Sequence, residues 1–298
     1  MANTPVQGSS LKGILSMALA AMILTLHDTL TKILLETYPI NQIVLVRQGF
    51  SLLILVVVVH ATVGWKGVGV VNRTAVAWRA IAFAATTVLI VASLSVLPVA
   101  IVLALVFASP LIVAALSVPF LGETVGRHRW AAILAGFIGI LIILRPFSSS
   151  FDILLVLPVA ASIAAGCRDV VTRWAGRTDS PLAILFWSNA AAVTLALFTV
   201  SFGWISISAT HLFLLLVVAG LNTAAHFLMI VSLRLADAAL VSPLRYTALV
   251  WAVILGYLIW GYLPDNWTFF GASIVICSSI YLGLREARLH KRTFRRVV

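Results

Sequence analysis

Charged residues are scarce in this chain. Asp, Glu, Lys and Arg make up 10% of its 298 residues, and hydrophobic residues make up 62%. Soluble domains carry about 25% charged residues, so this composition excludes an ordinary soluble protein. The net charge of +11 would suit a nucleic-acid partner only on a basic, water-facing surface. Here the charges are scattered between long apolar runs, which predicts an integral membrane protein in the lipid bilayer and no nucleic-acid partner.

Cysteine is nearly absent as well. The two cysteines, Cys167 and Cys277, lie in apolar segments and have neither disulfide-framework nor metal-ligand spacing. The chain also lacks a phosphate-binding glycine loop and a nucleophile with a nearby base. We therefore expect no enzyme activity, no cofactor and no metal site.

Long apolar runs are what the sequence has in abundance. A transmembrane helix needs about 20 mostly apolar residues, whereas a membrane β-barrel shows weak alternation in segments of about ten. The pattern predicts an all-α membrane protein with ten spans, joined by short loops that make neighbouring spans antiparallel. In order, these spans are Leu11–Leu35, Ile40–Val63, Trp78–Leu97, Ala100–Phe120, Arg129–Leu144, Ile153–Trp174, Pro181–Phe202, Thr210–Leu233, Ala238–Tyr262 and Trp267–Arg285.

The placement of Lys and Arg predicts the orientation. With the amino terminus inside, fifteen of the twenty fall in cytoplasmic segments, among them Arg73, Arg79 and the basic tail, and Arg145 alone falls outside. Such a bias places both termini in the cytoplasm. The first span carries Asp28 and Lys32 and exceeds the length of a cleaved signal sequence, so we expect it to be retained.

The two halves of the chain resemble each other. Residues 28–32 (DTLTK) match residues 169–173 (DVVTR), and Ser93-Leu94 matches Ser232-Leu233 at an offset of 139. Because five spans per half is an odd number, the second copy enters the membrane inverted, which places a binding site between the halves near the midplane. The predicted division is residues 1–147 for the first repeat, 148–285 for the second and 286–298 for a basic cytoplasmic tail.

Four charges inside or near the membrane demand a partner or a function, because an intramembrane charge is costly. Asp28 and Arg47 lie at equal depth in the first hairpin, about 10 Å below the surface. They form a structural ion pair, or Asp28 has a gating or proton-linked role. In the second half Asp169 has Arg173 four residues on, along the same helix face.

Polar and aromatic residues within the spans are candidates for lining a pocket. Because an unperturbed histidine titrates near neutrality, His27 and His226 suit either proton coupling or polar packing. Tyr246 follows Pro243 on a helical stripe, and Phe107 precedes Pro110 on another. Because prolines inside spans kink helices where a cavity or neighbour accommodates them, these aromatic residues line a pocket or simply pack.

Several motifs resemble a known family. They include Pro110, residues 121–123 (LGE) and Gly136 with Gly139 in the stretch 93–144, and residues 262–265 (YLPD) after the stretch 243–256. The chain resembles the drug/metabolite transporter superfamily, EamA type, of bacterial inner membranes. The resemblance implies ten helices, two cytoplasmic termini and a central cavity built from spans one, three, four, six, eight and nine. It favours as lining residues His27, Thr86, Phe107, His226, Tyr246 and Trp251.

The resemblance also implies a function. The chain looks closest to YddG-like exporters of aromatic amino acids, so a monomeric exporter of amino acids or related small metabolites, working by alternating access, is the first hypothesis. The second is uptake of a cofactor-like metabolite of the S-adenosylmethionine or riboflavin type. A membrane structural protein without transport activity is the hypothesis from another class.

Overall fold

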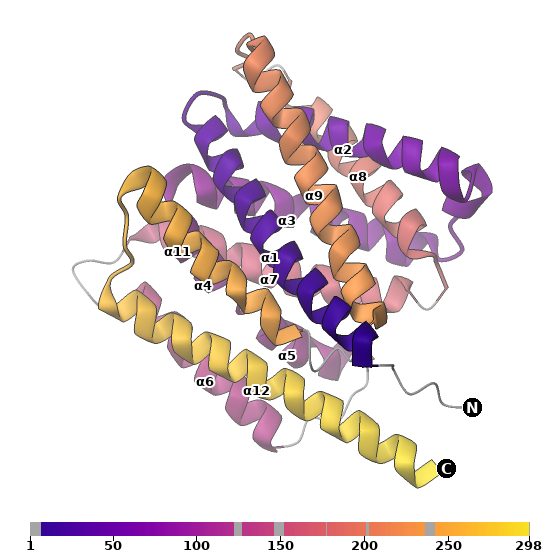
Figure 1. Ribbon diagram of the computed structural model, residues 1–298, viewed down its shortest axis with the longest axis vertical. Helices are drawn as coiled ribbons and strands as arrows, with labels where there is room; N and C mark the ends of the chain where they lie inside the picture. Colours follow the sequence, from indigo (N-terminus) through magenta and orange to yellow (C-terminus); the bar gives the residue numbers. More distant parts are fainter. Residues whose placement is uncertain are drawn as a thin grey trace.

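The computed structural model describes residues 7–121, 127–145, 152–176, 178–200, 203–235 and 242–297. These residues form α-helices and short 3-10 helices, with no strand among them (Figure 1). Each of the ten predicted spans contains a helix of the described structure, so the all-α prediction is confirmed.

The helices of the first half are α1 (Gln7–Leu35), α2 (Ile40–Thr62), η1 (Trp65–Val68), α3 (Arg73–Val96), α4 (Val99–Val106), α5 (Ser109–Leu121) and α6 (Arg127–Leu144). Those of the second half are η2 (Ile153–Leu155), α7 (Val156–Ala175), α8 (Pro181–Leu197), α9 (Ala209–Leu235), η3 (Ser242–Tyr246), α11 (Thr247–Trp260) and α12 (Asn266–Val297).

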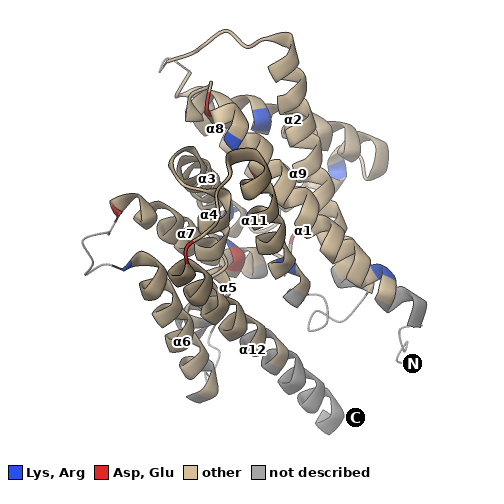
Figure 2. Ribbon diagram, turned by 60° about the vertical axis from the view of Figure 1, so that its left-hand side comes forward, with Lys and Arg blue, Asp and Glu red and all other residues tan. Residues whose placement is uncertain are grey.

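Length and apolar composition qualify several of these helices to cross a membrane. Within the described residues five do so in full, at Leu11–Leu35, Ile40–Thr62, Arg73–Val96, Ile153–Thr172 and Ala209–Met229. Large apolar side chains stand exposed on the outside of the bundle, as Leu134, Phe137 and Ile138 do on α6. Charged residues are few along the helices (Figure 2). An apolar exterior of this kind requires lipid as its solvent, and the protein is a multi-pass membrane protein.

Local signals explain where several helices begin and end. The side chain of Asn72 accepts a hydrogen bond from the Ala75 amide at 3.0 Å and caps α3. Ser180 caps α8 in the same way through the Ala183 amide. Gly261 ends α11 with a left-handed φ of 66°, a conformation that a residue without Cβ adopts at little cost.

The fourth predicted span is two helices rather than one. Helix α4 ends at Val106, and α5 begins at Ser109 after a turn at Phe107 and Ala108. Pro110 explains the break, because its ring lacks an amide proton and clashes with the carbonyl four residues earlier. The ninth span likewise starts as the 3-10 turn η3 before α11 begins at Thr247. Both interruptions occur at corresponding places in the two halves.

Helix packing shows how the halves are related. Helix α1 packs along α9, and α3 packs along α7, while α2 faces α8 and α6 faces α12. Exchanging the first half for the second leaves this pairing unchanged, as a two-fold relation between five-helix repeats requires. The start of α1 and the end of α12 lie on the same side of the molecule (Figure 1).

Helices α6 and α12 cross at two glycines. A Cβ on Gly139 would lie 2.8 Å from the Gly271 carbonyl oxygen, and a Cβ on Gly271 would lie 2.7 Å from that of Gly139. Glycine at a crossing lets two backbones approach closely in a membrane, where packing drives association. The largest apolar cluster begins beside this crossing and joins α4 to α11.

Candidate substrate site

An aromatic pair lies where the two halves meet. The rings of Phe107 and Tyr246 are 5.1 Å apart at an interplanar angle of 76°, an edge-to-face contact. Phe107 stands in the break between α4 and α5, and Tyr246 ends η3, so equivalent helix interruptions present both rings. The two residues are 139 positions apart, the same offset that relates Ser93 to Ser232. Both rings are only half-buried.

The helix break at Phe107 also leaves its backbone carbonyl within hydrogen-bond distance of the Ser279 side chain. The Ser279 hydroxyl of α12 donates to the Phe107 carbonyl at 3.4 Å. A helix break frees backbone carbonyls, and a neighbouring hydroxyl satisfies one of them here. Helix α12 thus stabilises the position of the aromatic pair.

A group of cationic and imidazole side chains gathers around His226. We call Arg79, Arg168, His226 and Arg245 the basic cluster. Arg168, Arg79 and Arg245 all lie within electrostatic range of His226, as does His27. They come from α3, α7, α9 and η3, so four separate segments converge here. The half-buried His226 and exposed Arg245 leave surface for a ligand with hydrogen-bond acceptors or negative charge.

Arg79 is the buried arginine of the cluster. It falls within the predicted span Trp78–Leu97, and the structure places it on α3 with only 7% of its surface exposed. Its Nη1 donates to the Ile184 carbonyl at 3.1 Å and to the Ser188 hydroxyl of α8. Its Nε donates to Thr172 Oγ1 of α7 at 3.3 Å. The small Ser188 makes room for this guanidinium.

His27, Asp28 and Arg47 form a buried chain between α1 and α2. His27 Nδ1 lies 3.0 Å from Asp28 Oδ1, and Arg47 Nη1 lies 3.1 Å from His27 Nε2. The direct Asp28–Arg47 ion pair predicted from equal depth is therefore wrong: among the described residues the imidazole lies between the two charges. A guanidinium only donates and a carboxylate accepts, so a neutral ring with its proton on Nδ1 satisfies both partners.

Asp169 has a partner on its own helix, one residue away. Arg168 Nη2 lies 2.8 Å from Asp169 Oδ1, and the two side chains are 23% and 37% exposed. The expected partner Arg173 lies on α7, but its side chain is outside the described part of the structure. In the same way residues 122–126, with the acidic turn residue Glu123, lie outside the described ranges.

The remaining candidates differ in what they offer. Trp251 is half-buried on α11 and keeps accessible surface. Thr86 is 2% exposed, and its hydroxyl donates to the Ala82 carbonyl of its own helix at 2.7 Å. The structure thus brings Phe107 to Tyr246 and His226 to the arginines, whereas Thr86 offers almost no surface to a ligand.

Polar contacts join the helices at the end of the bundle away from the termini. Lys32 Nζ of α1 donates to the carbonyls of Leu94 and Leu97 at 2.8 and 2.9 Å and lies 5.6 Å from the Trp260 ring centroid. The Trp260 indole donates to Glu36 Oε1 at 2.8 Å. These contacts bind α1 to the α3–α4 turn and to the end of α11, so they act against opening at this end.

Known proteins share both the sequence pattern and the fold. The sequence profile of the EamA-like transporter family matches residues 11–145 and 152–284, one match in each half. The chain belongs to the EamA-like transporter family. Transport, rather than enzyme catalysis, is therefore its function, and its substrate is a small molecule.

Relatives of this chain carry names with different substrates. A riboflavin transporter of Rhizobium johnstonii is 33% identical over 68% of this chain and 67% of its own length. An S-adenosylmethionine uptake transporter of Rickettsia conorii is 29% identical over 67% of this chain and 68% of its own. The pseudopaline exporter CntI of Pseudomonas aeruginosa is 26% identical over 91% and 95%.

A solved structure shares the fold. The crystal structure of a protein 17% identical to this chain superposes with a TM-score of 0.61 and covers 94% of this chain and 98% of its own. At this identity the likeness concerns the fold alone.

Proposed function

We propose that this transporter carries a cofactor-like metabolite, with an aromatic or heteroaromatic ring and a polar substituent, across the bacterial inner membrane by alternating access. The observation that carries the proposal is the Phe107–Tyr246 pair at the junction of the two repeats. Rings stack or meet edge-on with a flat substrate, each such contact being worth about 0.5–1.5 kcal/mol. The basic cluster then holds the polar substituent.

The relatives favour a cofactor-like solute over a simple amino acid. Riboflavin and S-adenosylmethionine are the named solutes of relatives that match two thirds of the chain. Each joins a heteroaromatic ring system to a polar chain. The ring system would contact the Phe107–Tyr246 pair, and the polar chain would accept hydrogen bonds from the basic cluster. The direction implied by the name of the second relative is uptake.

Export of an amino acid or related metabolite is the second candidate function. It is favoured by the exporter CntI, whose match extends over 91% of this chain. Aromatic amino acids present a ring and a carboxylate, which the same aromatic pair and arginines accommodate. The two candidates differ in ring size and direction, so a flux measurement separates them.

Alternating access fits the arrangement of the two ends. We propose that this conformation opens toward the terminal side, where Arg245 is exposed, and is closed at the end of Lys32 and Trp260. Both termini are assigned to the cytoplasm by the charge bias. The two repeats would exchange these open and closed arrangements in each cycle. A monomer suffices for this cycle, and His27 and Asp28 are the groups through which proton coupling would act.

Flux into proteoliposomes tests the proposal. Purified protein is reconstituted, and entry of labelled riboflavin, S-adenosylmethionine and tryptophan is measured separately. We expect saturable entry of a heteroaromatic solute, with Tyr246→Ala raising its KM by up to about tenfold as one aromatic contact is lost. Tyr246→Phe should retain most of the affinity because it keeps the ring.

Tyr257→Ala is the matched control, because Tyr257 is a tyrosine of α11, the helix that follows Tyr246 directly, and its side chain is exposed on the outside. It should leave KM unchanged. Saturable flux of tryptophan alone would favour the export candidate, and no flux of any amphipathic metabolite would favour a non-transporting structural protein.

A further inference from the structure

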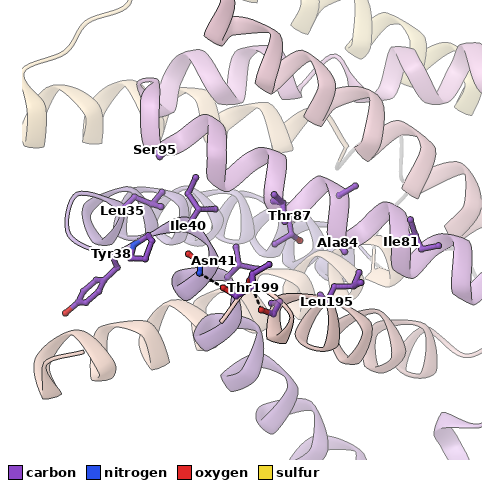
Figure 3. A pocket seen from close by; sticks show the side chains of 16 residues that line it. Leu35, Tyr38, Ile40, Asn41, Ile81, Ala84, Thr87, Ser95, Leu195 and Thr199 are labelled. Carbon is purple, nitrogen blue, oxygen red and sulfur yellow. Dashed lines mark hydrogen bonds between the residues drawn. The ribbon is translucent and has the colours of Figure 1, made fainter. Parts of the chain in front are cut away.

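A groove runs between α2, α3, α8 and the α1–α2 turn (Figure 3), and none of the candidate substrate-site residues lines it. Its volume is about 970 Å³. The rim carries exposed apolar side chains of α3 and α8, namely Ile81, Val88 and Leu195. We propose that this groove binds one acyl chain of a glycerophospholipid with an ammonium headgroup, and we call it the lipid groove.

Small residues create the lipid groove. Ala84 and Ala85 of α3 face Ala192 and Ala196 of α8 across its length, where bulkier apolar residues would fill the space. The three alanines at 84, 192 and 196 are buried, so they form the floor, while Ala85 is exposed on the wall. An apolar floor of this kind in a membrane-spanning bundle is in contact with hydrocarbon, because no water enters the bilayer core.

The length of the lipid groove fits one leaflet. It follows α3 from Ser95 to Ile81, fourteen residues that span about 21 Å at the rise of an α-helix. One leaflet is about 15 Å of hydrocarbon, or about 20–22 Å with its headgroup region, half of the bilayer dimensions. The groove therefore extends from the headgroup region of one leaflet to about the midplane, which is the course of a single acyl chain.

One end of the lipid groove is polar but uncharged. Ser95 and Thr199 lie there, near the ends of α3 and α8, with Asn41 of α2, whose Nδ2 donates to the Thr199 carbonyl at 2.8 Å. Each hydroxyl donates its proton to a backbone carbonyl close by, Ser95 to Ala92 at 2.8 Å and Thr199 to Ala196 at 2.6 Å. Their oxygens are left as hydrogen-bond acceptors. None of the sixteen residues that line the groove is charged.

Because this end offers hydrogen-bond acceptors and no Lys or Arg, it favours a lipid headgroup that donates hydrogen bonds. An ammonium headgroup, as in phosphatidylethanolamine, supplies three N–H donors, whereas an acidic headgroup is recognised by Lys or Arg. The apolar length and the acceptor end together select an ethanolamine phospholipid over phosphatidylglycerol.

Native mass spectrometry tests this assignment. The full chain is reconstituted in nanodiscs of phosphatidylethanolamine and phosphatidylglycerol in equal amounts, transferred to mild detergent and analysed for bound lipid. We expect the wild-type monomer to retain one phosphatidylethanolamine. Ala85→Trp places an indole inside the groove and should lower the retained fraction by about tenfold or more.

Ala131→Trp is the matched control, since Ala131 is an exposed alanine on the outside of α6. It should retain the lipid at the wild-type level. Ser95→Lys adds a cation at the polar end and should shift the retained lipid to phosphatidylglycerol, which keeps the proposal testable if Ala85→Trp fails to fold. The proposal is overturned if a folded Ala85→Trp variant retains lipid like the wild type, if the wild type prefers phosphatidylglycerol, or if a lipid-free dimer replaces the lipid-bound monomer.

Discussion

At the scale of single residues, the buried polar groups of this transporter are organised by neighbours that sequence spacing does not reveal. Asp28 and Arg47 each contact His27 rather than each other. Arg79 reaches two helices of the other repeat. Equal depth along two helices of a hairpin predicted that Asp28 and Arg47 would be near each other, but only side-chain direction decides which atoms meet.

Asp28→Asn should lower stability more than it alters the pH dependence of transport. The substitution removes the negative charge that offsets the buried Arg47, and breaking a buried charge pair costs about 3–5 kcal/mol. We expect a lower yield of monodisperse protein and a lower Tm in detergent. Asp169→Asn is the control and should cost less, because that carboxylate is more exposed. Normal Tm together with lost pH dependence of flux would instead assign Asp28 to proton coupling.

Asp179, in the loop before α8, gives the chain an acid-sensitive contact. The Thr178 hydroxyl donates to its carboxylate and lowers its pKa, as do the amides of Val71 at 2.6 Å and Asn72 at 3.0 Å, while burial acts in the opposite direction. A lowered folded-state pKa stabilises the protein above the unfolded value of about 3.9 and loses that contribution as pH falls through the folded value.

The wild type should therefore have a higher Tm than Asp179→Asn at neutral pH, and this difference should shrink as the pH is lowered below about 4. Thermal melts of both proteins across this range check the prediction. A difference in Tm that stays constant with pH would contradict the prediction, because it would show that the negative charge of Asp179 does not contribute to stability.

At the scale of elements, interrupted helices and glycine crossings define the junction between the repeats. Pro110 in the sequence indicated an irregularity, and the structure makes it a full break that presents Phe107 to Tyr246. Helical periodicity alone predicted a continuous span, because it indicates which face of a helix is apolar and not whether the helix is broken at one turn.

Gly271→Ala should destabilise the α6–α12 crossing. Its Cβ would lie 2.7 Å from both the Gly139 carbonyl oxygen and Ile143 Cγ1, so the helices must separate. Overpacking of this kind costs about 1–3 kcal/mol, and we expect a lower Tm. Gly220→Ala on α9 is the control, because its Cβ would meet nothing within 4 Å, and its Tm should be unchanged or higher. Equal Tm values for both variants would contradict the close crossing.

At the scale of the whole molecule, the repeat was predictable and the contacts between repeats were not. The match of Asp28 to Asp169 and of Ser93 to Ser232 indicated two copies, and five spans per copy required inversion. Which helix packs on which, such as α1 on α9, depends on tertiary contacts that a single sequence does not encode by period. The basic cluster escaped prediction for this reason, because its members come from four segments.

Counterflow tests the central claim, that the two repeats alternate access to one site at their junction. Proteoliposomes are loaded with unlabelled riboflavin or S-adenosylmethionine, whichever is transported, and entry of the labelled solute is followed with and without the internal load. Alternating access predicts transient accumulation of label above equilibrium in loaded vesicles, reduced in Tyr246→Ala and unchanged in Tyr257→Ala. Label that only equilibrates, equally with and without the internal load, would contradict the account.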